Sequence, residues 1–286
     1  MGNDTGSIPA LTKTELAKKL GVSRSSLYYR KKRPAIDEEI KRQIESVLTD
    51  HPSYGHKRIA LELKLNKKRI RRVMKKFGMK PYRRRVQKPQ KKGDRGKLPV
   101  SVPNVTKILC PIGPGVVYVS DFTYIRFQER FIYVATVMDM FTREIIGWNI
   151  SRYHNKSLVL GALMDAIKRQ GGKAPLWIHS DQGSEYDADD YMTIANAYGI
   201  TISMSNKASP WQNAFQESFY SHFKVDLADP ERFPTLGEFI EAIHHQIVDY
   251  NTNRIHTTLK TTPEKFRLRW EKTRKTSDTA SKEKGT

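Results

Sequence analysis

The spacing of apolar residues divides the chain into two parts with different periodicities. In the first part, Ile36, Ile40, Ile44 and Leu48 recur at the three- and four-residue steps of an amphipathic helix. From about residue 115 the pattern changes to short runs in which apolar and polar residues alternate, beginning with "GVVYVSDFTYIRF". Alternation of this kind is typical of β-strands. The pattern therefore predicts an all-α region followed by an α/β domain.

The second part predicts a mixed α/β sheet. Three consecutive strands are expected within residues 115–151, with turns at "QER" and "MFTRE". Shorter strands are expected in "APLWIHSD" and "ITISMS". Helices alternate with them and follow them, at residues 156–170, 187–199, 213–227 and 235–251. This order predicts a sheet with helices on both faces, in which the first strand is central and the strand ending at His179 pairs beside it.

The N-terminal residues 1–34 predict a leader followed by a helix-turn-helix. In "LTKTELAKKLGVSRSSLYYRKKRP", Thr12 and Glu15 form a capping-box pattern, and Gly21 breaks the first helix. A second helix is expected from Ser23, and Pro34 ends the unit. In this motif the start of the second helix contacts DNA bases, so the candidate contacts are Ser23, Arg24 and Ser25.

A second helical domain is expected over residues 35–82, and its last helix is strongly basic. Seven residues of the ten-residue stretch "KKRIRRVMKK" are basic, while Ile70, Val73 and Met74 form its apolar face. Such a helix could enter a major groove or lie along phosphates; a solvated helix on a small bundle is the alternative. The candidate DNA contacts are Lys67, Lys68, Arg69, Arg71, Arg72, Lys75 and Lys76.

Charge supports a polyanionic partner for the N-terminal third. Residues 1–100 hold 29 Lys and Arg against 9 Asp and Glu, a net charge of +20 out of +21 for the whole chain. Basic segments of this kind usually meet phosphate, and a solubilising surface is the simpler alternative. Residues 83–105 lack periodicity and predict a basic linker, in which Arg83, Arg84 and Arg85 are further candidate DNA contacts.

Cysteine content and hydropathy restrict the class of protein. The single cysteine, Cys110, excludes a disulfide framework within the chain and a zinc site rich in cysteine. The start "MGNDTGSIPA" carries no signal-peptide pattern, and no apolar run approaches the roughly 20 residues of a membrane span. A soluble, cytoplasmic protein is therefore expected.

Three acidic residues stand out against the sheet pattern. Asp121 lies late in the first predicted strand, Asp181 follows an apolar run in "WIHSDQGSEY", and Glu217 lies in a predicted helix. Adjacent strand ends would bring the two aspartates together, and a helix packed on the sheet could add Glu217. Converging carboxylates repel one another and favour a shared hard cation, Mg²⁺ or Mn²⁺. Each acid alone could equally be a surface charge, and Asp139 also lies between apolar residues.

Three motifs together resemble those of the DDE transposase and integrase superfamily: "YVSDFTYI", "WIHSDQGSEY" and "SPWQNAFQESFYSHFK". Asp181 and Glu217 have 35 residues between them, the spacing typical of this group. Within it, the chain looks like the second-frame product of insertion-sequence family three, and retroviral integrases look like more distant relatives. The resemblance covers about residues 35–270 and includes "HPSYGHKRIALEL" and the closing "YNTNRIHTTLKTTPEKF".

The resemblance implies a ribonuclease H-like core over residues 106–270, behind helix-turn-helix domains, with a disordered tail at 271–286. It implies phosphoryl transfer on DNA, in which water frees a 3′-OH that then attacks another phosphodiester. Asp121 and Asp181 would flank two Mg²⁺ or Mn²⁺ ions, and Glu217 would hold one of them. Lys224 would contact the terminal DNA. His179 and Asn213 are candidate positioning residues, for which a core or capping role is the alternative.

The same resemblance implies the partners. These are double-stranded DNA, as transposon terminal inverted repeats and target DNA, and a second copy of the chain in a dimer on DNA. An upstream-frame protein is a further implied partner, and the implied location is the bacterial cytoplasm, at the nucleoid. Two other functions stay open: a structure-specific nuclease without strand transfer, and a DNA-binding regulator with an idle catalytic domain.

Overall fold

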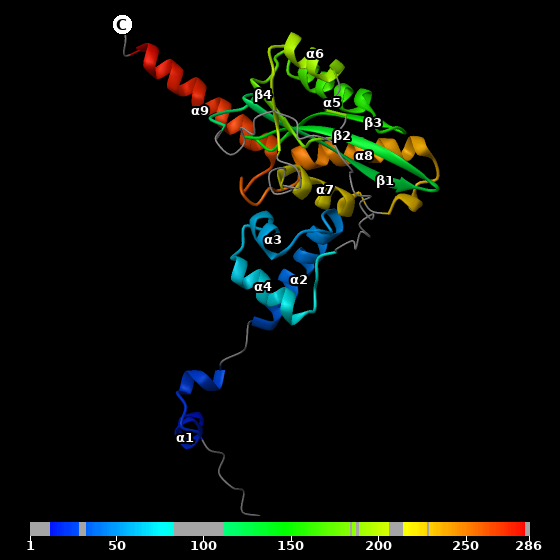
Figure 1. The fold of residues 1–286 in the computed structure, drawn as a ribbon. Helices are drawn as coiled ribbons and strands as arrows, with labels where there is room; N and C mark the ends of the chain where they lie inside the picture. The colour runs from blue at the N-terminus through cyan, green and yellow to red at the C-terminus, as the bar shows by residue number, and fades with distance from the viewer. Residues whose placement is uncertain are drawn as a thin grey trace, which may run out of the picture.

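A computed structural model describes residues 12–28, 33–82, 111–183, 185–186, 189–205, 214–227 and 229–283. Helices α1 to α4 come first, and an α/β core follows, as the two periodicities predict (Figure 1). Within the described ranges, no helix combines the length and the apolar character that crossing a bilayer requires.

The first helical unit differs from the predicted helix-turn-helix in its second half. Helix α1 (Lys13–Lys19) begins with the expected capping box of Thr12 and Glu15, and Gly21 turns the chain with a φ of 64°. The next element, η1 (Arg24–Tyr28), is a short 3₁₀ helix where an α-helix was predicted. The Ser23 hydroxyl lies 2.8 Å from those of Ser25 and Ser26, and such local serine contacts compete with helical geometry. Ser23, Arg24 and Ser25 therefore do not open a recognition α-helix.

The second helical unit has a hydrophobic core of its own. Its three helices are α2 (Arg33–Asp50), α3 (His56–Glu62) and α4 (Lys67–Lys76). Ile44, Ile59, Ile70 and Val73 are fully buried between them, together with Tyr54. The last helix begins after Asn66, whose side chain accepts a hydrogen bond from the Lys68 amide and caps α4.

The core holds a five-stranded sheet in the order β3-β2-β1-β4-β5. Strands β1, β2 and β3 pair antiparallel, whereas β4 pairs parallel with β1 and with β5. The predicted central position of the first strand is confirmed, and so is its neighbour ending at His179. The strands are β1 (Val117–Phe127), β2 (Arg130–Asp139), β3 (Ile145–Ser151), β4 (Trp177–Ser180) and β5 (Thr201–Met204).

Helices cover both faces of this sheet, as predicted (Figure 1). One face packs against α5 (Lys156–Arg169) and α6 (Asp189–Ala197), and the other against α7 (Ala214–Asp226) and α8 (Leu236–Thr252). Gly147 of β3 lies directly under α5, where an added Cβ would come within 2.4 Å of the Ala166 backbone nitrogen. The close approach of α5 to the sheet therefore requires glycine at this position.

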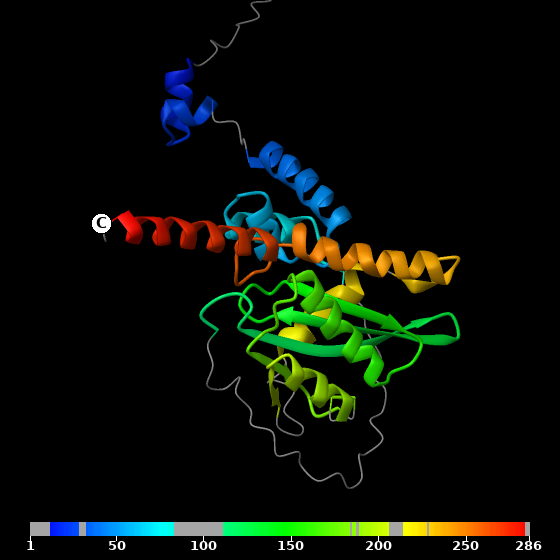
Figure 2. The same cartoon turned by 90° about the horizontal axis from the view of Figure 1, so that it is seen from above.

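The C-terminal segment corrects one prediction. Residues 271–283, expected to be a disordered tail, continue helix α9 (Pro263–Glu283), which extends away from the core in Figure 2. Local contacts support the helix: Arg267 pairs with Glu271 one turn on, and the Arg274 guanidinium lies 5.3 Å from the centroid of the Trp270 ring. A short 3₁₀ helix, η3 (Pro230–Arg232), joins α7 to α8.

Candidate active site

The sheet register brings the first two predicted acids to the same level on neighbouring strands. Strands β1 and β4 run parallel, with Val119 opposite His179. Asp121 lies two residues beyond Val119, and Asp181 lies two residues beyond His179, immediately after β4 ends. The two aspartates therefore lie at equivalent positions on neighbouring strands, as the sequence predicted, but Asp121 lies in the first half of β1 and not late in the strand.

Helix α7 carries Glu217 and is fixed to the sheet by buried polar side chains. The Gln216 side-chain amide donates to the backbone carbonyls of Val119 on β1, at 2.7 Å, and Thr136 on β2, at 3.3 Å. The Tyr220 hydroxyl, one turn further on, donates to the backbone carbonyl of Asp121 at 2.7 Å. The first turn of α7 is thus tied to the strand that carries Asp121, and Glu217 is exposed beside it.

Sequence reasoning did not identify Gln216 and Tyr220 as part of the site. Gln216 is completely buried, and its side-chain oxygen accepts from the Thr136 hydroxyl at 3.1 Å. The available signal was the spacing of Gln216 and Tyr220, two hydrogen-bonding side chains one helical turn apart and close to Phe219 and Phe223. Polar groups at buried positions need partners, and here the partners are strand carbonyls beside the acids.

Gln216→Ala should destabilise the fold measurably. The substitution removes buried hydrogen bonds to two strand carbonyls and to the Thr136 hydroxyl, which keeps the Tyr220 hydroxyl at 2.8 Å as its other partner, and this costs about 1–3 kcal/mol. Urea denaturation of the full chain measures this loss. The matched control is Gln43→Ala, because Gln43 is exposed and bonds only to Glu39 within α2, at 3.2 Å. An equal, small effect of both substitutions would contradict the role given to Gln216.

Electrostatics show that the three acids share one neighbourhood. Burial raises the pKa of Asp121 well above its ordinary value, and the negative charges of Asp181 and Glu217 raise it further. Lys224, two turns after Glu217 on α7, acts on the pKa of Asp121 in the opposite direction. Its ammonium lies 5.0 Å from the centroid of the Tyr124 ring on β1. Lys224 therefore lies on the acidic side of α7.

A tight turn holds Asp181. The Gly183 amide donates to Oδ1 of Asp181 at 3.1 Å, and the Tyr186 amide donates to the Gly183 carbonyl at 3.0 Å. A Cβ on Gly183 would approach the carboxylates of Asp181 and Glu185 to 3.1 Å and 3.0 Å. The glycine of "SDQG" therefore leaves room for two acidic side chains to fold around the turn.

The donor set fits a divalent metal by its chemistry. Asp121, Asp181 and Glu217 offer only carboxylate oxygens, the ligands that Mg²⁺ and Mn²⁺ prefer, and a cation would relieve the repulsion among them. In the described part of the chain, no three His, Cys, Asp or Glu side chains are gathered closely enough to hold one ion. Asp121, Asp181 and Glu217 thus do not form a closed ligand cage in this structure.

Two other candidates at the sheet have structural partners. Asp139 is buried and accepts from the backbone amides of Gly115, Phe141 and Thr142, so it holds the turn between β2 and β3. His179 is completely buried, and its Nδ1 lies 2.9 Å from the Ser203 hydroxyl on β5. Burial lowers the pKa of His179 to about 4, so its imidazole is neutral at physiological pH.

The basic helix α4 does not expose all seven of its predicted DNA contacts equally. Asp37 of α2 is buried, and its carboxylate accepts from Arg72 at 2.8 Å and from Lys76 at 3.1 Å. Asp37 had no signal in the sequence, because its partners lie 35 and 39 residues away. Arg72 and Lys76 thus help to hold α4 on α2, and the exposed residues without this tie are Lys67, Lys68, Arg69, Arg71 and Lys75.

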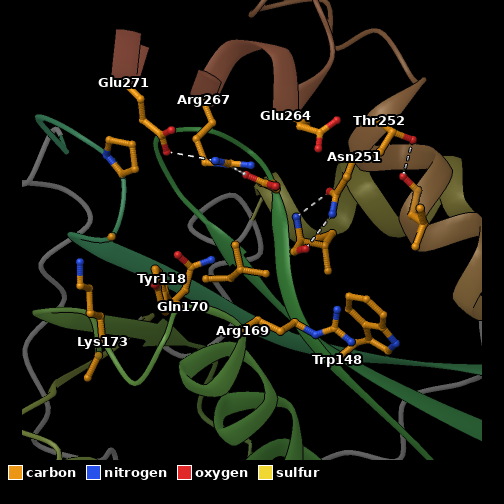
Figure 3. A pocket seen from close by; sticks show the side chains of 17 residues that line it. Tyr118, Trp148, Arg169, Gln170, Lys173, Asn251, Thr252, Glu264, Arg267 and Glu271 are labelled. Atoms are coloured by element: carbon orange, nitrogen blue, oxygen red, sulfur yellow. Dashed lines mark hydrogen bonds and ion pairs between the residues drawn. The ribbon is translucent and has the colours of Figure 1, made fainter. Parts of the chain in front are cut away.

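A separate pocket of about 700 Å³ lies between β3, α5 and the start of α9 (Figure 3). Trp148 and Arg169 form one side of it, where the guanidinium lies 3.9 Å from the ring centroid. On the other side Arg267 bridges Glu144 and Glu271. None of the three predicted acids lines this pocket, so it is not the acidic site.

Several predicted residues lie outside the described part of the chain. They are Arg83, Arg84 and Arg85, the rest of the linker up to residue 105, the leader up to residue 11, and Asn213. The roles predicted for them stay predictions.

Comparison with known proteins gives matches over most of the chain. Two family models, both described as an integrase core domain, match residues 112–210 and 198–263. The transposase for insertion sequence element IS904 of Lactococcus lactis is 31% identical over 242 residues, which cover 82% of this chain and 95% of that protein. The putative transposase InsK for IS150 of Escherichia coli is 28% identical and covers 88% of this chain and 92% of that protein.

Solved structures share the fold. In the structure of a simian T-cell lymphotropic virus intasome, one chain matches with a TM-score of 0.50 and 13% sequence identity. The match covers 74% of this chain and 74% of that chain.

Proposed function

The chain belongs to the insertion-sequence transposases of family three, which are related to retroviral integrases, and we propose that Asp121, Asp181 and Glu217 are its catalytic carboxylates. It is therefore a polynucleotidyl transferase with a ribonuclease H-like core, and it catalyses DNA cleavage and strand transfer. The observation that supports the assignment is the parallel register of β1 and β4, which places Asp121 and Asp181 at equivalent positions, beside the helix α7 that Gln216 and Tyr220 tie to β1.

Each residue has a defined task in this proposal. Two Mg²⁺ or Mn²⁺ ions would be bound by Asp121 and Asp181, on adjacent strands, and by Glu217, on α7. The metal supplies charge stabilisation and activates the attacking oxygen. Gln216 and Tyr220 keep α7 at a fixed position against β1. Lys224 faces the same side and contacts the terminal DNA.

A strand-transfer assay tests this assignment. Duplex oligonucleotides that carry the element's end are incubated with the full chain and Mg²⁺, and products are mapped at single-nucleotide resolution. Cleavage to a 3′-OH followed by joining to a second duplex is expected. Cleavage without joining would instead identify the structure-specific nuclease, and end binding without cleavage would identify the regulator.

The division of the chain follows the same proposal. The helical units within residues 1–34 and 35–82 bind the terminal inverted repeats, residues 83–105 link them to the core, and residues 106–270 carry the chemistry. Strand transfer joins two ends, and each core has one acidic cluster, so a dimer on DNA is the smallest complete assembly. An upstream-frame protein remains a further candidate partner, and the nucleoid of a bacterial cytoplasm is the proposed place of action.

Two neighbouring arginines of α4 separate DNA contact from structural support. Arg71 is exposed and forms no ion pair with a described carboxylate, whereas Arg72 forms an ion pair with Asp37. Arg71→Ala should weaken end binding and reduce the slope of log affinity against log salt by about 0.9, the contribution of one phosphate contact. Arg72→Ala should instead lower the unfolding temperature, because Asp37 loses its main partner.

Fluorescence anisotropy with a labelled end duplex, at several salt concentrations, measures the slope. Thermal unfolding of both variants measures the structural effect. If Arg72→Ala changed the salt slope and Arg71→Ala did not, the proposed face of α4 would be the wrong one.

A further inference from the structure

The second helical unit is docked on the core through partly buried polar contacts. Arg58 of α3 donates from Nε to the Ile255 carbonyl at 3.1 Å, and its Nη2 lies 3.2 Å from Nε2 of His222 on α7. The Ile255 amide donates in return to the Tyr54 hydroxyl at 2.7 Å. Figure 1 shows α3 directly beside α7. The junction therefore joins the DNA-binding side of the chain to the helix that carries Glu217.

A cavity of about 270 Å³ lies at this junction. Its wall combines Arg58 from the helical unit with Arg143, Arg254 and His256 from the core. Phe215 and His222 line it from α7, on the side away from Gln216 and Tyr220. The exposed residues Ser218, Thr257 and Thr258 also line it, and the remaining lining residues are Met138, Ala214, Phe219, Tyr250 and Ile255.

The cavity carries an excess of positive charge. Three arginines line it and no acidic residue does; the carboxylate of Asp226 lies behind it, paired with the buried Arg254. Burial and the charge of Arg254 lower the pKa of Arg58 to about 10, so the arginines repel one another but stay charged. Like charges held together in a partly buried space favour a counter-ion of opposite sign.

His256 adds a hydrogen-bonding side chain to the cavity wall. Burial, together with the neighbouring arginines, lowers the pKa of His256 to about 4, so its ring is neutral. Its Nδ1 is buried and has no hydrogen-bond partner among the described residues. A neutral imidazole can donate one hydrogen bond, and guanidinium groups donate in the fork geometry that matches phosphate oxygens.

We propose that this cavity is a phosphate-binding site, formed by Arg58, Arg143, Arg254 and His256, that closes the junction between the helical unit and the core. The ligand is a tetrahedral phosphate group, either on bound DNA or as free inorganic phosphate. An anion there would bridge arginines from both units and so hold α7 and the helical unit in one arrangement. The DNA source rests on the proposed function, whereas binding of phosphate itself does not.

Titration of the full chain with inorganic phosphate tests the site. Isothermal titration calorimetry and thermal unfolding, at constant ionic strength set with potassium chloride, are expected to show saturable binding and a rise in unfolding temperature. Arg143→Gln and Arg58→Gln should each weaken phosphate binding at least tenfold. One variant lies in the core and the other in the helical unit. The unfolding temperature of each variant in chloride alone shows whether that variant is folded.

The matched control is Arg169→Gln. Arg169 and Arg143 both belong to the α/β core and stack on an aromatic ring. The guanidinium of Arg169 lies 3.9 Å from the centroid of the Trp148 ring, and that of Arg143 lies 3.6 Å from the centroid of the Phe215 ring. Arg169 lines the other pocket, and its substitution should leave phosphate binding unchanged. Absence of saturable binding to the wild-type chain, or equal binding by all three variants, would overturn the proposal.

A second titration identifies the source of the phosphate. The titration is repeated with a saturating concentration of the duplex that carries the element's end. If inorganic phosphate no longer binds, the site is occupied by a DNA phosphate, and if it binds as before, the ligand is free phosphate. A chain that binds phosphate in this way but fails the strand-transfer assay would refute the proposed catalytic assignment and leave the phosphate site standing.

Discussion

Asp121→Asn should abolish DNA cleavage and, at the same time, make the metal-free protein more stable. The loss of activity follows from removing a carboxylate that would hold both metal ions. Metal ions contribute several kcal/mol of transition-state stabilisation, and each 1.4 kcal/mol is a factor of ten in rate, so a fall on the order of a thousand-fold is expected. Binding to the end duplex should be largely retained, because the basic helices are far from this residue in the chain.

The gain in stability follows from the pKa of Asp121. Burial and the nearby Asp181 and Glu217 raise that pKa in the folded state above the ordinary value of 3.8. A carboxyl with a raised pKa stabilises the fold below its unfolded pKa, and this contribution is lost as pH rises through the folded pKa. Above the unfolded pKa, the folded environment of Asp121 therefore lowers the stability of the metal-free chain, and asparagine, which does not titrate, removes this cost.

Thermal unfolding in EDTA and in Mg²⁺ checks both parts. Wild-type protein should gain stability with Mg²⁺, since binding to the folded state alone shifts the equilibrium, and Asp121→Asn should gain much less. Asp190→Asn is the control, because Asp190 is exposed and pairs only with Lys156. Near wild-type cleavage by Asp121→Asn, or a lower unfolding temperature in EDTA, would show that Asp121 is not a buried ligand.

The parts of the fold that sequence predicted have local signals. Alternation marks β1 and β2, and the apolar run before Asp181 marks β4, so the positions of Asp121 and Asp181 followed from strand order. Glycines at 171 and 172 ended α5 near the expected place. These features depend on neighbours a few residues apart, which is the range over which residue patterns are informative.

The features that sequence did not predict depend on distant partners or on competing local bonds. Asp37 pairs with Arg72 and Lys76 of α4, which lie 35 and 39 residues later in the chain. These pairs leave the two basic side chains less available for DNA. The junction cavity joins Arg58 to a loop 197 residues later, at Ile255. The 3₁₀ turn after Ser23 reflects serine hydroxyl contacts, which the helical pattern does not contain.

Removal of the ion pair between Arg254 and Asp226 should cause a large loss of folding stability. Both side chains are almost completely buried, with 3% and 4% of their surface exposed. Asp226→Ala leaves the Arg254 charge buried beside Arg58 without its carboxylate, and such a change costs about 3–5 kcal/mol. Urea denaturation of the full chain should therefore show a much lower midpoint for this variant.

Asp190→Ala serves as the control for ion-pair removal. The pair of Asp190 and Lys156 is more than half exposed on both sides, so its loss should cost no more than about 1 kcal/mol. Equal effects of the two substitutions would show that burial of the Arg254 pair contributes nothing to the fold.

Phosphate should partly restore the Asp226→Ala variant. Asp226 is not a lining residue but pairs with Arg254, so its removal leaves the charge of Arg254 without that carboxylate, and an anion is held more strongly in the cavity than in the wild-type chain. Phosphate binding to the folded state then raises the unfolding midpoint by an amount that grows with its concentration. The double variant with Arg143→Gln should lose this recovery. A specific site distinguishes phosphate from chloride by its hydrogen bonds. If chloride at the same ionic strength raised the midpoint equally, the recovery would come from general charge screening and not from phosphate binding.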